Sequence, residues 1–106
     1  MISSLQKDET ILEVIKKLFD KFGEANLKLT NYWDADLCAV GIKNLKDGKN
    51  LIYISTYNIK EKHYFVEVED TNREVILNGY KKGELWERNF EELFEIVETY
   101  LYLKPL

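Results

Sequence analysis

Residues 36–57, DLCAVGIKNLKDGKNLIYISTY, carry the pattern from which the fold can be predicted. Two apolar runs rich in β-branched residues flank a connection that contains Asp47 and Gly48. An Asp-Gly pair between two such runs is a strong hairpin signal, because glycine adopts a positive φ at no steric cost. We therefore predict two antiparallel strands here, at the centre of the domain.

The two faces of this hairpin differ in chemistry, because successive side chains of a strand point to opposite faces. One face is aliphatic, and it is predicted to carry Cys38, Val40, Ile42, Ile52 and Ile54. The other face is small, aromatic and hydroxylated, and it is predicted to carry Leu37, Ala39, Gly41, Tyr53, Ser55 and Tyr57. The aliphatic face is expected to pack into the core, and the other face is a candidate working surface.

Further strands extend the hairpin on both sides. Residues 27–33 alternate briefly and are predicted to form a first strand at the sheet edge. In residues 63–70 the residues Tyr64, Val66 and Val68 share one face, whereas Phe65, Glu67 and Glu69 share the other, which is typical of a half-buried antiparallel strand. Residues 74–80 are predicted to form the next strand, and residues 85–86 a short connector.

Helical periodicity marks both ends of the chain. Residues 8–22 place apolar side chains at three-and-four spacing, and Gly23 follows as a stop signal. A second helix is predicted from Phe90 to about Leu103, with Asn89 and Glu92 as a capping box and Pro105 beyond its end. The predicted fold is α+β: one domain over residues 1–106, in which a single antiparallel meander sheet of four to five strands has both terminal helices packed on one face.

Composition limits the classes of function. Acidic residues exceed basic ones by 19 to 15, which gives a formal net charge of −4 and argues against nucleic acid as a partner. We expect a cytoplasmic protein that does not enter the membrane, because the first residues lack a signal-peptide pattern and no apolar run approaches the roughly 18 residues needed to span a bilayer. We also expect a monomer when the protein is free.

Catalytic and metal-binding patterns are weak. Cys38 is predicted to be a buried, inert thiol, and His63 an exposed residue at a strand start. Zinc and phosphate-loop signatures are lacking, so we expect no cofactor and no enzymatic activity. Asp34 and Asp36 could share a cation if the backbone between them is extended, whereas the simpler interpretation is that they cap a turn.

A binding surface is the stronger prediction. Carboxylates attract a basic partner, and rigid aromatic rings give contact area at low entropic cost. The predicted partner-binding residues are Asp34, Asp36, Tyr53, Tyr57, Phe65, Glu67 and Glu69. An ordinary solvated sheet face is the competing interpretation, and the acidic run from Glu84 to Glu98 is a second candidate surface.

The runs NYWDADLCAVGI (31–42), LIYISTYN (51–58) and YFVEVE (64–69) resemble small bacterial immunity proteins paired with contact-dependent growth inhibition toxins and related polymorphic toxins. This resemblance implies a non-catalytic protein that binds and neutralises the C-terminal domain of a cognate toxin, often a basic nuclease. The group is diverse in fold and shares no functional motif, so the resemblance assigns no residue a role.

Two alternatives remain open at this point. One is a small α+β regulatory module that binds a peptide or small ligand between sheet and helix. The other is a metal-dependent hydrolase that uses Asp34, Asp36, Glu67 and Glu69.

Overall fold

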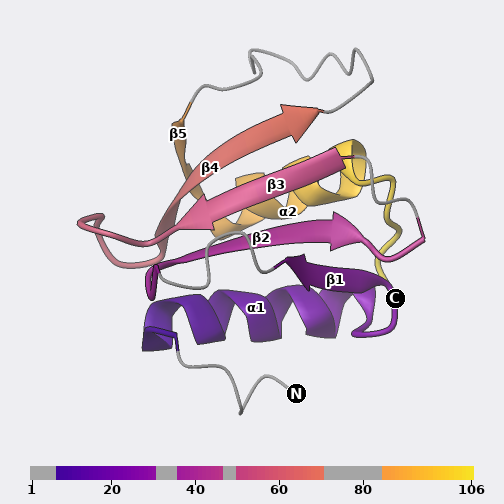
Figure 1. Ribbon diagram of the computed structural model, residues 1–106, viewed down its shortest axis with the longest axis horizontal. Helices are drawn as coiled ribbons and strands as arrows, with labels where there is room; N and C mark the ends of the chain where they lie inside the picture. Colours follow the sequence, from indigo (N-terminus) through magenta and orange to yellow (C-terminus); the bar gives the residue numbers. More distant parts are fainter. Residues whose placement is uncertain (1–6, 31–35, 47–49, 71–84) are drawn as a thin grey trace.

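The computed structural model describes residues 7–30, 36–46, 50–70 and 85–106. It contains a five-stranded antiparallel sheet in the order β1-β2-β3-β4-β5, with one helix before and one helix after it along the chain (Figure 1). The elements are α1 (Glu9–Phe22), β1 (Leu27–Thr30), β2 (Ala39–Asn44), β3 (Asn50–Ser55), β4 (His63–Asp70), β5 (Trp86–Asn89) and α2 (Phe90–Tyr100). The predicted α+β meander is therefore confirmed.

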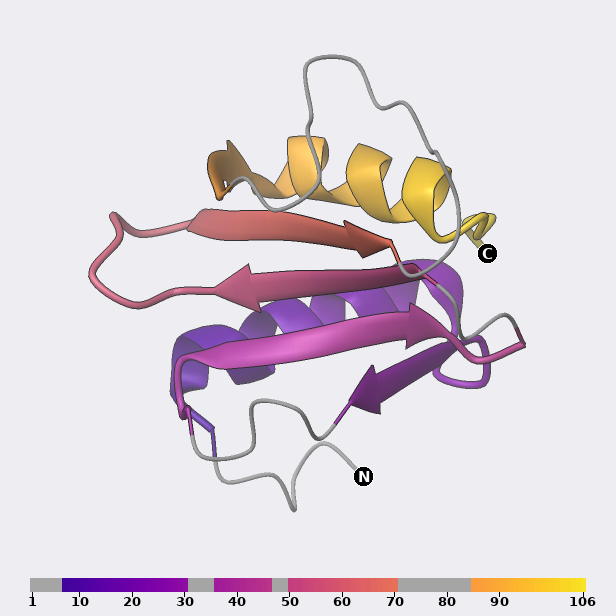
Figure 2. The same cartoon turned by 45° about the horizontal axis from the view of Figure 1, so that its top comes forward.

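Both helices lie behind the same face of the sheet, which we call the inner face (Figure 2). The strand register aligns Val40, Ile54 and Val66 across β2, β3 and β4. These three side chains are buried in the core together with residues of α1 and α2. The aliphatic face of the hairpin thus packs against the helices, as the alternation predicted.

Helix α1 begins and ends at the expected signals. The side chain of Asp8 accepts a hydrogen bond from the main-chain N–H of Thr10 at 3.0 Å and forms the N-cap. Gly23 forms the C-cap with φ 92°, a conformation that favours glycine because it has no Cβ. One stripe of the helix is buried: Ile11, Val14, Ile15, Leu18 and Phe22.

The two helices contact each other directly. The rings of Phe22 and Phe94 stack with their centroids 4.9 Å apart. The ammonium groups of Lys17 and Lys21 lie over the rings of Phe90 and Phe94, at 5.3 and 5.9 Å from the centroids. The residue later in α1 contacts the residue later in α2, so the two helices run parallel to each other.

Helix α2 has the predicted start but an earlier end. The side chain of Asn89 accepts from the N–H of Glu92, whose carboxylate in turn accepts from the N–H of Asn89, so the capping box is confirmed. The helix ends at Tyr100 and not near Leu103, because the side-chain amides of Asn50 and Asn44 donate to the carbonyls of Tyr100 and Leu101 at 2.8 and 2.9 Å. Side chains from the sheet thus satisfy terminal carbonyls that a further helical turn would otherwise use.

Two local predictions are wrong. Residues 86–89 form strand β5 and not a connector, since pairing with β4 gives this polar segment partners that its own sequence pattern does not reveal. Cys38 is half-buried and not buried as predicted, because it lies in the turn before β2 and that strand begins only at Ala39. The Asp47-Gly48 connection, the end of the predicted 27–33 strand and the predicted 74–80 strand lie outside the described residues.

In the described part of the chain, no helix has the length and apolar character needed to cross a bilayer.

Candidate functional site

The sheet face opposite the helices, which we call the outer face, carries side chains that the sequence predicts to bind a partner. The register places Gly41, Tyr53 and Glu67 in one row across β2, β3 and β4. The neighbouring row consists of Ala39, Ser55, Phe65 and Glu87. Ala39 and Ser55 are buried, whereas Tyr53 and Phe65 are half-buried, so the aromatic side chains form the accessible part of these rows.

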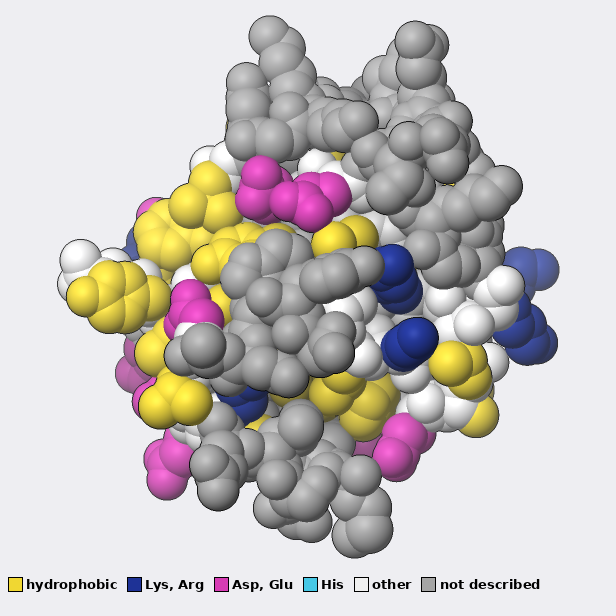
Figure 3. All heavy atoms as spheres, in the orientation of Figure 1, with side chains coloured by type: hydrophobic (Ala, Val, Ile, Leu, Met, Phe, Trp, Pro, Cys, Tyr) yellow, Lys and Arg dark blue, Asp and Glu magenta, His cyan; other side chains and the backbone are white. Residues whose placement is uncertain are grey.

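A shallow groove of about 400 Å³ lies at the end of the outer face where β3 ends and β2 begins. We call it the aromatic groove, and its lining residues are Asp36, Tyr53, Ser55, Tyr57, Phe65 and Leu85. Four of the seven residues predicted to bind a partner therefore lie together. The space-filling view of this face shows hydrophobic side chains gathered on its left part, with acidic side chains among and above them (Figure 3).

Asp36 is held in a fixed orientation at the rim of the groove. Its Oδ1 accepts a hydrogen bond from the main-chain N–H of Cys38 at 3.0 Å, and its main-chain carbonyl accepts from Lys7 Nζ at 2.7 Å. The turn-capping interpretation of this residue is thus confirmed. Asp34 lies outside the described residues, so the predicted carboxylate pair is not placed.

Tyr57 reaches the groove from a turn and not from a strand, because β3 ends at Ser55. The hydroxyl of Ser55 accepts from the main-chain N–H of Tyr57 at 3.2 Å, and Asn58 follows with φ 53°. Tyr57 is 69% exposed and Leu85 is 54% exposed. Ser55 and Leu85 are not among the seven predicted partner-binding residues; alternation had placed Ser55 on the same face as Tyr53, whereas no local pattern indicates Leu85.

Glu67 and Glu69 lie on the outer face but do not line the groove. A binding surface and a solvated sheet face, the two interpretations that the sequence offers, both predict exposed side chains here. Glu67 and Glu69 are instead half-buried, because Tyr53 and Leu51 lie directly opposite them on β3. Burial raises the pKa of the Glu67 carboxyl above its ordinary value, and the nearby charge of Glu69 raises it further. Ionisation of Glu67 is therefore less favourable than ionisation of an ordinary exposed glutamate.

Charge is divided across the outer face. The register places Lys28 and Lys43 opposite each other on β1 and β2, whereas Glu67 and Glu69 lie on β4. In Figure 3, most of the visible basic side chains lie to the right of the centre, whereas most of the hydrophobic side chains lie to the left. The groove therefore lies beside the acidic part of the face. Glu87, opposite Phe65, is the exposed partner of Lys60 at 3.7 Å.

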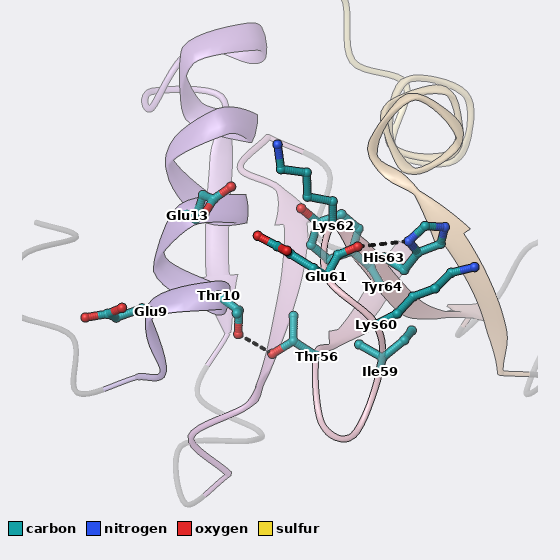
Figure 4. A pocket seen from close by; sticks show the side chains of 10 residues that line it. All are labelled: Glu9, Thr10, Glu13, Thr56, Ile59, Lys60, Glu61, Lys62, His63 and Tyr64. Carbon is teal, nitrogen blue, oxygen red and sulfur yellow. Dashed lines mark hydrogen bonds between the residues drawn. The ribbon is translucent and has the colours of Figure 1, made fainter.

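A second cavity, the helix–loop cleft, lies between the first turns of α1 and the β3–β4 connection (Figure 4). Its volume is about 270 Å³, and its lining residues are Glu9, Thr10, Glu13, Thr56, Ile59, Lys60, Glu61, Lys62, His63 and Tyr64. Thr10 Oγ1 lies 2.5 Å from Asp8 Oδ2 and 2.6 Å from Thr56 Oγ1. Because Thr10 has one hydroxyl proton and Asp8 can only accept, Thr56 must donate to Thr10.

The helix–loop cleft was not predicted, since it joins residues 46 positions apart in sequence. His63 starts β4 as expected, although it is half-buried and its Nδ1 lies 3.1 Å from the carbonyl oxygen of Glu61. Within the described ranges, no three Asp, Glu, His or Cys side chains converge into a group that could hold a metal ion.

Comparisons of this chain with protein-family models, with curated proteins and with solved structures gave no match.

Proposed function

We propose that this chain is a non-catalytic immunity protein that binds and neutralises a basic toxin domain through its outer face. The observation that carries the proposal is the aromatic groove, in which Asp36, Tyr53, Tyr57 and Phe65 lie together although they come from two strands and two turns. These residues agree with the binding surface that the sequence predicts, and the resemblance to immunity proteins supplies the class of partner.

The composition of the groove suits protein binding more than catalysis. Aromatic side chains dominate the energetics of many interfaces, because they bury a large area and lose little conformational entropy. An exposed tyrosine beside half-buried rings provides such area, and the acidic residues nearby favour a positively charged partner. A net charge of −4 acts in the same direction at longer range.

A co-expression assay tests this proposal. The wild-type chain should protect cells from the toxin domain encoded beside it, whereas the double variant Tyr53→Ala and Tyr57→Ala should lose protection. Loss of one central aromatic anchor is expected to cost about 2 kcal/mol, or roughly a thirtyfold faster dissociation. Leu45→Ala is the matched control, because Leu45 is also exposed but does not line the groove.

Folding of each variant is checked by circular dichroism and thermal denaturation. Full protection and unchanged dissociation in the folded double variant would rule out the groove. Failure of the wild-type chain to bind any toxin domain encoded nearby would rule out the immunity function itself.

A ligand-binding regulatory module is the second candidate, and the helix–loop cleft is the observation that favours it. In that case Thr56→Val, which removes the hydrogen bond between Thr10 and Thr56, should abolish ligand binding, whereas the double variant Tyr53→Ala and Tyr57→Ala should retain it. Under the immunity proposal, Thr56→Val should retain protection against the toxin domain and the double variant should lose it.

A further inference from the structure

We propose that the aromatic groove is a pocket for an arginine side chain of the partner, whose guanidinium stacks on the rings of Tyr57 and Phe65 and pairs with the carboxylate of Asp36. This inference rests on the proposed function and adds the chemistry of the residue that the groove recognises.

The lining of the groove fits a flat cation. Three aromatic rings and one carboxylate border a space of about 400 Å³. A guanidinium is planar and weakly hydrated, so it stacks on an aromatic face and still donates hydrogen bonds at its edge. A lysine ammonium is compact and strongly hydrated, and it fits such a lining less well.

The Asp36 carboxylate is oriented before a partner arrives. The hydrogen bond from Cys38 N–H holds Oδ1, and no contact with another described residue engages Oδ2. A fixed acceptor loses little entropy on binding, and a hydrogen bond between two charged groups is stronger than one between neutral groups. Within the described part of the chain, no cation lies over the ring of Tyr57 or Phe65.

The molecule already contains the same arrangement elsewhere. The guanidinium carbon of Arg88 lies 4.5 Å from the centroid of the Trp86 ring, and Arg88 Nε lies 3.8 Å from Glu92 Oε2. One guanidinium thus stacks on a ring and meets a carboxylate at its edge. The groove presents the ring and carboxylate parts of this arrangement toward the outer face.

The charges around the groove favour entry of a cation. Glu67 lies opposite Tyr53, and Glu87 lies opposite Phe65. Two described lysines lie nearby as well: Lys60 pairs with Glu87 at 3.7 Å, and Lys7 Nζ donates to the main-chain carbonyl of Asp36. The carboxylates of Asp36, Glu67 and Glu87 therefore exceed these two ammonium groups by one. A cation that approaches Tyr53 therefore also comes near the carboxyl group of Glu67.

The test is a nuclear magnetic resonance titration of the whole ¹⁵N-labelled chain with the capped tripeptide acetyl-Gly-Arg-Gly-amide. We expect saturable shifts of the backbone amides of Cys38, Tyr57 and Phe65. The citrulline analogue has nearly the same shape but no charge, and it should bind about tenfold more weakly or worse. The lysine analogue should bind at least about threefold more weakly, because it cannot stack.

Two variants locate the interaction. Asp36→Asn retains an oxygen that can accept from Cys38 N–H but removes the charge, so the fold is preserved and the arginine peptide should bind about fivefold more weakly or worse. Phe65→Leu keeps an apolar side chain but removes the ring face, and it should reduce the preference for arginine over lysine. Asp20→Asn, at an exposed position of α1 away from the groove, is the matched control and should not change the affinity.

Equal binding of the arginine and citrulline peptides would overturn the proposal, as would equal binding of arginine and lysine or shifts that Asp36→Asn leaves unchanged. Because the titration uses no toxin, the two proposals fail separately. If the chain binds the arginine peptide but no toxin, the arginine pocket is supported and the immunity function is refuted. If the chain binds a toxin through Tyr53 and Tyr57 but shows no preference for the arginine peptide, the immunity function is supported and the arginine pocket is refuted.

Discussion

Ile54 is the residue on which the facing of the sheet depends. It is fully buried in the middle of β3, between Val40 and Val66, whereas its neighbours Tyr53 and Ser55 point to the outer face. Truncation to alanine should cost roughly 2–5 kcal/mol of unfolding free energy, because it removes apolar contacts and leaves a cavity. Chemical denaturation measures this cost, and exposed Leu45→Ala should cost less than about 0.5 kcal/mol. A cost for Ile54→Ala as small as that of the control would mean that the strand faces the other way.

Single residues of the site show where sequence reasoning reaches its limit. Alternation placed Tyr53 and Phe65 on the same face, because the side-chain period of a strand is independent of what the strand packs against. The same rule predicted too much burial for Cys38, because it assumes that the strand has already begun. Asp36 caps a turn here, and the strand begins only at Ala39. The rule also gave Glu67 and Glu69 too much exposure, because the size of their cross-strand neighbours depends on register.

At the scale of elements, the start of α2 is the feature that sequence and structure define most fully. Asn89→Ala removes the side-chain acceptor for the Glu92 N–H and breaks the capping box, so it should reduce the free energy of unfolding by about 1 kcal/mol, within a range of about 0.5–2. Denaturant unfolding checks this, with Thr99→Ala at an exposed position near the other helix end as the control. An unchanged stability of Asn89→Ala would show that packing of α2 against the core, and not its cap, sets the start of the helix.

Elements with long, periodic patterns were predictable, and those fixed by distant contacts were not. Both helices and the central strands carry their own apolar periodicity, so their positions follow from local sequence. Strand β5 has only four residues and no alternation, and it exists through its pairing with β4. The end of α2 depends on Asn44 and Asn50, which lie 57 and 50 positions before the carbonyls they bind. The helix–loop cleft is non-local in the same way.

In the whole molecule, the sheet face that packs into the core lies opposite the face that is proposed to bind a partner. The helices cover the inner face (Figure 2). The aromatic groove lies on the outer face, at the end of the sheet where two turns meet. Lysines lie on β1 and β2, whereas Glu67 and Glu69 lie on β4. A basic partner is therefore expected to approach over β4. Under the proposed function, the groove would provide contact area and the carboxylates would provide attraction at a distance.

Because charges attract at long range, we predict that Glu67 and Glu69 mainly affect the rate of association with the toxin domain. In the double variant Glu67→Gln and Glu69→Gln, association with the toxin domain should slow by about an order of magnitude at low salt, with little change in dissociation. The wild-type rate should fall toward that of the variant as salt rises, because the screening length shortens from about 10 Å at 0.1 M to about 3 Å at 1 M. Stopped-flow mixing measures both rates.

Burial and Glu69 raise the pKa of Glu67, so Glu67 loses its charge at a higher pH than an ordinary glutamate does. The faster association of the wild type should therefore decline as the pH falls through the raised pKa of Glu67. The same shift means that ionised Glu67 opposes folding above its ordinary pKa, so the double variant should be at least as stable as the wild type at pH 7. Equal association rates for a stable double variant and the wild type at low salt would show that the partner does not approach over β4.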